Sequence, residues 1–360
     1  MTASDTPKRN WFAPRNYISM SFWDGMGTTL FNAFIFLLLI IYLFPLVYMT
    51  ATAFMTSEQV GDRYSPPYPA QQERITLDGE DHLVYNVPMP DGSTRKLALI
   101  ERGQTSSEFI DPADPTTPIQ WEGSWRTLPG VYRFSLTLDN FKLLFESLPL
   151  PMMARNTLTI ALVTGVAVLF SSILVAYGFA RFPLPGGNLL FYVLIATMLI
   201  PEKVTLIPSY FTFVRVLEWN GTLLPVVLPF FFGSAVLIFL LRQNFKSIPK
   251  EMEEAAMLDG AGPLRILFQI VLPQSWPVII TAALLHFFYI WNESRLASLY
   301  LASNRNLQPI SFGVQGFQSL SPIVQVIQAA ALITMVVPIV VLLLTQKYFM
   351  RNLVITGMEK

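Results

Sequence analysis

The stretch EEAAMLDGAG, residues 253–262, lies between two strongly apolar segments and differs from both of them. It is acidic and rich in alanine, and it closes at Asp259-Gly260. RILFQIVLP follows almost at once and leads into the next apolar segment. A short polar helix of this composition belongs at a surface, so the rest of the chain decides which surface that is.

The composition indicates a membrane protein. Hydrophobic residues occupy 52% of the 360 positions and charged residues 13%, whereas a soluble domain usually carries about 25% charged residues. The formal net charge of +0 gives no reason to expect nucleic acid as a partner. The chain contains no cysteine, which excludes disulfides, thiolate zinc sites and cysteine nucleophiles.

Six segments are long and apolar enough to cross a bilayer as helices, since a span needs roughly 20 mostly apolar residues. They cover approximately residues 29–54, 157–180, 189–213, 223–241, 277–301 and 324–348. The first is too long, and its flanks are too poor in small residues, for a cleaved signal peptide. We therefore expect an all-α membrane protein with six transmembrane helices, preceded by a cytoplasmic segment over residues 1–28.

Lysine and arginine predict the orientation, because they concentrate next to spans on the cytoplasmic side. With the N-terminus inside, the inner segments hold most of them: Lys8, Arg9, Arg15, Arg181, Arg242, Lys246, Lys250, Arg265, Lys347, Arg351 and Lys360. The short outer loops hold little beyond Arg215 and Arg305. Both termini and the stretch 253–262 are therefore expected in the cytoplasm.

Residues 247–273 are predicted to form a helical hairpin. Ser247 is expected to cap its first helix and Pro249 to occupy the first turn, with glutamates close to the positive end of the helix dipole. Gly260 is expected to follow the helix end with a positive φ.

A second short helix is expected to begin after Pro263 and to end at Pro273. One of its faces is predicted to carry the apolar residues Leu264, Leu267, Phe268 and Val271. Interfacial helices are common in membrane proteins, so amphipathicity alone does not separate a docking hairpin from a plain interfacial one.

The spacing of the hairpin favours docking. Its Glu-Ala-Ala triplet is followed after three residues by a glycine and after nine more by Ile-Val-Leu-Pro. The pattern resembles the EAA signature of permease subunits of ATP-binding-cassette importers, in which this hairpin docks into a groove of the cytoplasmic ATPase. The resemblance implies an ATPase-coupling role for Glu254, Ala255, Ala256, Gly260, Ile270, Leu272 and Pro273.

The resemblance extends from residue 135 to the C-terminus and, less sharply, to LFPLVYMTATAF in the first span. It is carried by LDNFKLLF, RNTLTIAL, AYGFARFPLPGG, ATMLIPEKVTLIPSY, FLLRQNFKSIPKEMEEAAMLDGAG, IWNES and QKYFMRNLVITG, in this order. The chain is similar to maltose-type carbohydrate permeases, and specifically to the smaller of the two partner subunits. This family is the binding-protein-dependent transport inner membrane component family.

The resemblance implies the type I ABC importer permease fold in a bacterial or archaeal cytoplasmic membrane, surrounded by membrane lipid. It implies three kinds of partner: a second permease subunit, two cytoplasmic ATPase subunits and an extracytoplasmic solute-binding protein. The implied function is to form, with the second permease, the pathway for a sugar or oligosaccharide. The chain itself is then a non-catalytic subunit.

Residues 55–135 depart from the family pattern, which has only a brief connection between the first span and the permease domain of residues 136–360. HLVYNVPMP and TRKLALIER flank Asp91-Gly92, and Asp78-Gly79 marks another turn. PPYP and DPADPTTP are expected as linkers or extended edges. We expect a small β-rich extracytoplasmic insertion, which is either functional or simply tolerated as surface-loop length.

Catalytic and metal-binding patterns are missing from the sequence. It contains no G-x-x-x-x-G-K-[ST] phosphate loop, so the chain is not expected to bind the nucleotide that drives transport. His82 lies in the insertion, and His286 lies in the fifth span without other metal-ligating residues at suitable spacing. We therefore predict no catalytic residue, no cofactor and no metal, and a buried interior position for His286.

Ionisable residues inside spans are costly and are therefore candidates for function. The resulting prediction for the substrate pathway is Trp291, Asn292 and Glu293 in the fifth span, with Glu202 and Lys203 after Pro201 in the third. An aromatic face, an amide and a carboxylate together suit a neutral, hydroxyl-rich sugar. The alternative is a polar cluster that joins these spans to the partner subunit, and in maltose-type permeases the partner can make most of the sugar contacts.

Two other functions remain open at the level of sequence. A permease for a non-sugar solute, such as a glycerol phosphodiester or a polyol, would keep most of the motifs, and Lys203 with Arg295 would suit its charge. An intramembrane enzyme or a receptor would need a catalytic dyad within the spans or a cytoplasmic effector domain, and the sequence shows neither.

Overall fold

The computed structural model describes residues 22–77, 79–320 and 323–356. The chain divides into two compact units, Met1–Met49 and Thr50–Lys360. Helix α1 (Phe22–Ala53) makes up the described part of the first unit and extends to the start of the second. Its large apolar side chains from Leu30 to Tyr48 are exposed, as expected for a helix surrounded by lipid, whereas Ala53 at its end is buried.

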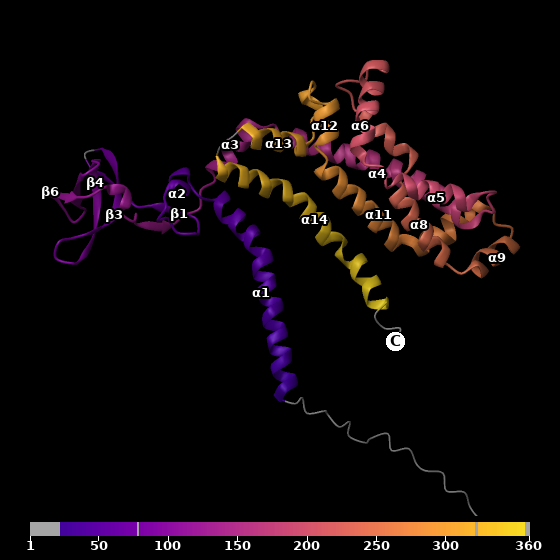
Figure 1. Ribbon diagram of the computed structural model, residues 1–360, viewed down its shortest axis with the longest axis horizontal. Helices are drawn as coiled ribbons and strands as arrows, with labels where there is room; N and C mark the ends of the chain where they lie inside the picture. Colours follow the sequence, from indigo (N-terminus) through magenta and orange to yellow (C-terminus); the bar gives the residue numbers. More distant parts are fainter. Residues whose placement is uncertain (1–21, 78, 321–322, 357–360) are drawn as a thin grey trace, which may run out of the picture. The chain divides into compact units, whose positions relative to one another are not determined.

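The second unit contains the remaining helices (Figure 1). In chain order these are α2 (Ser57–Gly61), α3 (Asp139–Ser147), α4 (Leu150–Arg181), α5 (Gly187–Thr197), α6 (Glu202–Tyr210), α7 (Leu224–Val227), α8 (Ala235–Ser247), α9 (Lys250–Leu258), α10 (Pro263–Ile266), α11 (Leu272–Asn292), α12 (Arg295–Tyr300), α13 (Ile310–Leu320) and α14 (Val324–Thr356).

Among the described residues, five helices are long and apolar enough to cross a membrane, or six if the bent pair α5 and α6 forms one span. The six-span prediction therefore agrees with the structure. The third predicted span is not a straight helix, however, because α5 and α6 meet at an angle of 86°. Pro201, with φ −61° and ψ 128°, lies at the break and starts α6, since its ring cannot continue the hydrogen-bond ladder of α5.

Two further predicted spans are interrupted. The fourth consists of α7, a 3-10 segment (Leu228–Phe232) and α8, with Gly233 at φ 80° before α8. The fifth was expected to continue to residue 301, but α11 ends at Asn292 and the extended residue Glu293 follows it. The carboxylate of Glu293 accepts a hydrogen bond from the backbone N–H of Leu296 at 2.9 Å, which helps to start α12 as a separate helix.

Helix α4 is the central helix of the second unit and packs against both α8 and α11 (Figure 1). Its hydroxyl residues Thr157, Thr164 and Ser172 are fully buried, and such small residues let helices approach closely. Thr164 donates to the carbonyl of Ile160 at 2.7 Å. Nε2 of His286 on α11 lies 2.8 Å from the same hydroxyl oxygen, so His286 occupies the buried interior position that the sequence predicts.

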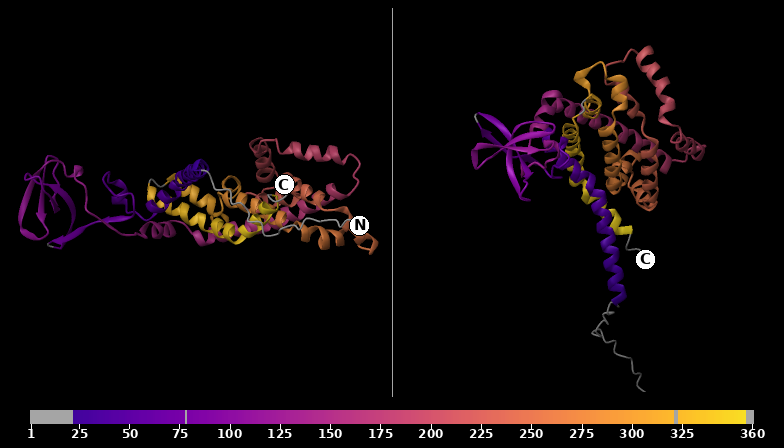
Figure 2. Two further views of the ribbon diagram at one scale, coloured as in Figure 1. Left: turned by 90° about the horizontal axis from the view of Figure 1, so that it is seen from below. Right: turned by 60° about the vertical axis from the view of Figure 1, so that its left-hand side comes forward.

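The insertion after α1 is a β-structure, as predicted. Strands β2 (Arg74–Leu77), β3 (Glu80–Pro88), β4 (Thr94–Glu101), β5 (Ser106–Asp111) and β6 (Asp114–Glu122) form one antiparallel sheet in chain order. Strands β1 (Ala70–Gln72) and β7 (Tyr132–Phe134) form a second, two-stranded sheet. Figure 2 shows the twisted larger sheet from two directions. Its core includes the fully buried side chains Val87, Leu97 and Phe109.

The predicted turns of the insertion are largely confirmed. Gly92 (φ 82°) lies between β3 and β4, where the Asp91 carboxylate accepts a hydrogen bond from the N–H of Ser93 at 2.8 Å. Gly79 (φ 88°) precedes β3, while Asp78 lies outside the described residues. DPADPTTP takes the extended-edge alternative of its prediction: it covers the end of β5, the turn after it and the first half of β6, an edge strand, where proline is tolerated.

Candidate functional site

The hairpin at residues 247–273 begins with α9, whose end has the predicted geometry. Gly260 has φ 81°. Its N–H donates to the carbonyl of Met257 at 3.0 Å, and the N–H of Ala261 donates to the carbonyl of Ala256 at 2.9 Å. These two bonds form a Schellman motif, which places a left-handed residue directly after the helix. Glycine reaches that conformation without steric cost.

The predicted start of α9 is wrong. Ser247 is the last residue of α8, and its hydroxyl donates to the carbonyl of Asn244 at 2.7 Å instead of capping α9. Pro249 occupies the N-cap position. The cause is the proline, because the residue before a proline is forced into an extended conformation. Ile248 accordingly has φ −74° and ψ 128°, which ends α8 and separates it from α9.

The predicted second helix does not end at Pro273. Residues Pro263–Asn292 run on as one helical segment that is long and apolar enough to span a membrane, made of α10, a π-helical turn (Leu267–Val271) and α11. Pro273 lies in the first turn of α11. Its missing N–H is tolerated there, directly after the wider π turn.

The predicted apolar face of this second segment is also wrong. Leu267 and Val271 are fully buried, whereas Leu264 and Phe268 are more than half exposed. The buried face instead includes Ile266 and packs against residues of α4 and α8. The segment therefore belongs to the helical core, and only its start forms a hairpin with α9.

A buried ion pair holds α9 against the spans. Nε of Arg181, the last residue of α4, donates to Oε1 of Glu253 at 2.6 Å. The two side chains are only 7% and 5% exposed. Nη2 of Arg181 also donates to the carbonyl of Ile248 at 2.9 Å, in the link between α8 and α9. One guanidinium at the end of α4 thus binds both a side chain of α9 and the backbone of the residue pair that precedes it.

Sequence reasoning missed this ion pair. It treats Glu253 as a charge at the helix dipole and Arg181 as a marker of orientation. The two residues are 72 positions apart, and a single sequence carries no signal that brings them together.

The seven predicted coupling residues divide into two groups in the structure. Glu254, Ala255, Gly260 and Pro273 are exposed, whereas Ala256, Ile270 and Leu272 are half-buried against the helical core. Large apolar side chains next to the exposed group are also open to solvent: Met252 is 45%, Met257 54% and Leu258 90% exposed. An exposed apolar surface of this kind indicates a site of protein contact.

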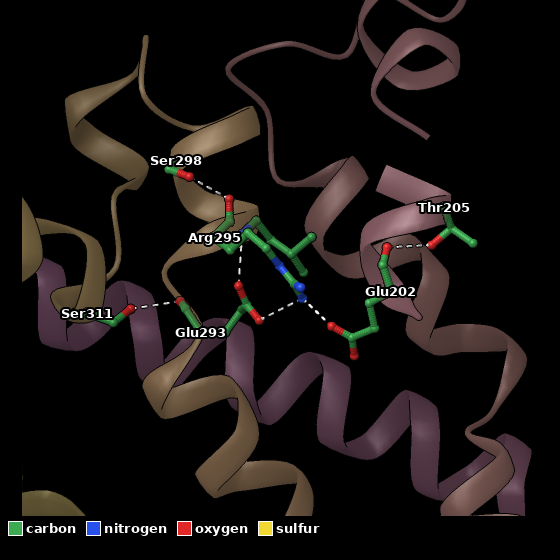
Figure 3. A network of polar contacts seen from close by, with 7 residues as sticks. Glu202, Thr205, Glu293, Arg295, Ser298 and Ser311 are labelled. Carbon is green, nitrogen blue, oxygen red and sulfur yellow. Dashed lines mark hydrogen bonds and ion pairs between the residues drawn. The ribbon is translucent and has the colours of Figure 1, made fainter. Parts of the chain in front are cut away.

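The second candidate site is a charged network at the break between α11 and α12 (Figure 3). Nη2 of Arg295 donates to the carboxylate of Glu202, at the start of α6, at 2.5 Å, and to that of Glu293 at 3.4 Å. The backbone carbonyl of Glu293 accepts a hydrogen bond from the hydroxyl of Ser311 on α13 at 2.8 Å. The network therefore joins three segments at positions where α-helix is interrupted or begins.

The other predicted pathway residues lie at a cavity of about 350 Å³ that borders α11, α13 and α14. Trp291 is buried, and its indole N–H donates to the carbonyl of Thr334 at 2.9 Å. Asn292 is exposed, and its amide donates to the carbonyl of Phe288 at 2.8 Å. The cavity also has polar lining residues that the sequence reasoning did not single out, because serine and glutamine are common outside functional sites: Ser294, Ser311, Gln315 and Gln318.

The predicted pathway set is therefore divided between two places. Trp291 and Asn292 line the cavity, whereas Glu293 and Glu202 belong to the charged network. Lys203 is exposed and forms no ion pair with any residue in the described part of the chain.

Comparison with known proteins identifies the family. Residues 168–354 match the model of the binding-protein-dependent transport system inner membrane component family, which is more than half of the chain. The protein belongs to this family. It is thus a non-catalytic membrane component of an ABC importer, which confirms the resemblance found in the sequence.

Individual relatives agree with the assignment. The permease is 34% identical over 212 residues to the sn-glycerol-3-phosphate transport system permease protein UgpE of Pectobacterium atrosepticum, covering 57% of this chain and 73% of that protein. It is 32% identical over 200 residues to the osmoprotective compounds uptake permease protein GgtD of Synechocystis sp., covering 55% and 67%. It is also 29% identical to a probable ABC transporter permease protein, PH1036, of Pyrococcus horikoshii, covering 66% and 86%.

A solved structure supports the fold. The permease aligns with a chain of a bacterial ABC transporter involved in the import of the acidic polysaccharide alginate, with a TM-score of 0.64 and 18% identity. The alignment covers 91% of this chain and 98% of that chain. The permease therefore has the importer permease fold that the sequence predicts.

The Arg181–Glu253 pair of the permease can be tested by removing one charge. Glu253→Gln would leave a buried guanidinium uncompensated, at a cost of about 3–5 kcal/mol. We expect hydrogen exchange of the α9 amides to rise by about a hundredfold, with little change in α4 and α11. Mass spectrometry of the exchanged protein would measure this. Glu251→Gln, which changes an exposed glutamate on the same helix, is the matched control, and equal exchange in both variants would contradict the anchoring role.

Proposed function

We propose that this permease and a second permease subunit form the translocation pathway of an importer for sugars or oligosaccharides. An extracytoplasmic solute-binding protein would deliver the solute, and two cytoplasmic ATPase subunits would dock on the permease pair. The observation that carries the proposal is the geometry of α9. This helix is exposed on its outer face, bears Met257 and Leu258 there, and is anchored to the spans by a buried ion pair.

The connections of α9 explain how docking could drive transport. Arg181 ties the helix to the end of α4, and the Schellman turn leads within a few residues into the continuous segment of α10 and α11. A displacement of α9 by the ATPase would therefore reach two helices that pack against each other. Such a rigid linkage suits alternating access, in which closure of the ATPase subunits moves the spans as bodies.

The expected topology follows from the same proposal. ATP is hydrolysed in the cytoplasm, so α9 faces the cytoplasm, as the distribution of lysine and arginine predicts. Both termini then lie in the cytoplasm, and the β-insertion lies on the outer side, where the solute-binding protein delivers its load.

The chemistry of the candidate pathway favours a neutral, hydroxylated solute. The cavity beside Trp291 is lined by an indole, an amide from Asn292, glutamine side chains and hydroxyls, and none of the described residues that line it is charged. The indole N–H is already bonded to Thr334, but the amides and hydroxyls can bond to sugar hydroxyls. The single cation of the neighbouring network, Arg295, faces two carboxylates and is already compensated.

A phosphorylated or polyol solute is the second candidate. It is supported by Lys203, an exposed cation next to the network, and by relatives whose names refer to sn-glycerol-3-phosphate and to osmoprotective compounds. Uptake assays with a sugar panel and with sn-glycerol-3-phosphate would distinguish the two candidates.

The docking role of α9 is tested by Gly260→Val. A β-branched residue cannot adopt φ 81° without a cost of about 1 kcal/mol or more, so the Schellman turn should distort. We expect a membrane-inserted permease that pairs with its partner, retains little ATPase on detergent purification and supports almost no uptake. Gln269→Ala, an exposed residue of the following segment, should have a mild effect. Full recovery of the ATPase with wild-type uptake in Gly260→Val would refute the docking role.

The pathway role of the cavity is tested at Asn292, because the buried Trp291 also supports packing and its loss would be ambiguous. Asn292→Ala removes a lining amide, and the loss of one solute hydrogen bond should lower the uptake rate at low solute concentration by about tenfold. Basal ATPase activity and complex yield should stay close to wild type. Asn220→Ala, an exposed asparagine away from the cavity, is the control. Unchanged uptake in Asn292→Ala would exclude Asn292 from the pathway.

A further inference from the structure

A second cavity, of about 590 Å³, lies where α4 ends, close to the start of α9. It is bordered by the loop from α4 to α5, by the last turns of α8 and by the first residue of α9 (Figure 1). Four basic residues line it, Arg181, Arg242, Lys246 and Lys250, and no acidic residue of the described part of the chain does so. The proposed transport function gives this cavity no role.

Three of the four positive charges are uncompensated in the described part of the chain. Only Arg181 has a carboxylate partner, Glu253, which does not border the cavity. Lys246 and Lys250 are exposed and have no ion pair with any described residue. The lining of the cavity is therefore strongly positive and favours the binding of an anion.

Arg242 gives the cavity a fixed, nearly buried cation in addition to its two exposed lysines. Its side chain is nearly buried, with 8% of the residue exposed, and its guanidinium lies 3.8 Å from the centre of the Phe191 ring. Nε donates to the carbonyl of Phe179 at 3.3 Å. Among the described residues this is the one hydrogen bond of the Arg242 side chain, so the N–H groups of its two terminal nitrogens are unused. The fixed guanidinium is thus held by stacking and is free to bind an oxyanion.

The start of α5 adds donors to the same cavity. Gly186 precedes this 11-residue helix with φ 68°, and no side chain caps the helix there. Gly186, Gly187 and Asn188 all border the cavity. The N–H of Gly187 already donates to the carbonyl of Leu184 at 2.9 Å. The next amides of the first turn and the helix dipole favour an oxyanion, and here they lie beside three cations.

The surface next to the cavity is apolar. Along α5, Leu189 is 68%, Leu190 54%, Tyr192 69% and Val193 55% exposed. Exposed side chains of this kind on a membrane helix face hydrocarbon. The cavity thus presents cations and backbone donors directly beside the exposed apolar side of α5.

We propose that this cavity binds the phosphodiester headgroup of an anionic phospholipid, with the acyl chains lying along α5. Arg242, Lys246 and Lys250 supply the positive charge, and the uncapped start of α5 supplies backbone donors. A free phosphate would satisfy the donors but would leave the apolar face of α5 unused. Basic pockets at the ends of transmembrane helices are suited to such headgroups.

The test is native mass spectrometry of the purified full-length permease with dioleoylphosphatidylglycerol or dioleoylphosphatidylcholine in mixed micelles. We expect tighter binding of phosphatidylglycerol, and Lys246→Gln with Lys250→Gln should weaken it about tenfold. Lys246→Arg with Lys250→Arg should restore it. Lys142→Gln with Arg155→Gln removes two exposed charges elsewhere and is the matched control.

The other outcomes would overturn the proposal. Equal binding of the two lipids would show that the cavity does not distinguish an anionic headgroup from a zwitterionic one. An equal loss in both neutralised pairs would show that the effect depends on net charge and not on the cavity. Displacement of phosphatidylglycerol by millimolar inorganic phosphate would assign the cavity to a free anion. The neutralised lysines are exposed, so we expect the variants to fold normally. Unchanged circular dichroism and elution volume would show this.

Discussion

The ion pair between Arg181 and Glu253 is the contact on which the proposed mechanism depends. Two buried charges are costly to desolvate, and the pair compensates them only while both partners stay in place. The guanidinium meets a second demand as well, since it also binds the carbonyl of Ile248 at 2.9 Å. A short polar helix at the edge of a membrane protein would otherwise have few contacts to fix it. Here its position is set by the end of the central span.

In the second unit, the candidate functional polar groups lie where helices are interrupted. Pro201 ends the regular helix before Glu202, the extended residue Glu293 ends α11, and Gly233 separates a 3-10 segment from α8. At two of the breaks a side chain replaces a lost helical partner: the Glu293 carboxylate accepts from the N–H of Leu296, and the Ser172 hydroxyl accepts from the N–H of Ser234. At the third, Glu202 begins α6 and pairs with Arg295. Polar side chains therefore gather at the breaks of an otherwise apolar bundle, which is what a pathway for a hydrophilic solute needs.

Much of the architecture could be predicted because it rests on local rules. Span number follows from apolar length, the turn at Gly260 from the need for a positive φ, and the hairpin at Gly92 from Asp-Gly between two alternating strands. The family signature then extended these rules to the importer permease fold. Two of the errors occurred where a proline had two possible roles: Pro249 displaced the cap from Ser247, and Pro273 started a helix that it was expected to end. The end of the fifth span and the apolar face after Pro263 were also predicted wrongly.

The candidate sites were harder to predict because they depend on contacts between distant segments. Nothing in the residues around Arg181 or Glu253 indicates that they meet, and the 86° bend that brings Glu202 to Arg295 depends on packing around Pro201. The basic cavity shows the same limit. Its charges come from α4, α8 and α9, and in the sequence they indicate orientation only.

Site-specific cross-linking of α9 in the assembled importer would show whether this helix contacts the ATPase. The chain has no cysteine, so Leu258→Cys, at the most exposed apolar position of α9, would provide a unique attachment point for a benzophenone maleimide. We expect a photo-adduct between this position and the ATPase subunit, and none from Lys142→Cys on α3. An adduct of Leu258→Cys with the solute-binding protein, or the absence of any adduct with a subunit of the importer, would contradict docking of α9 on the ATPase.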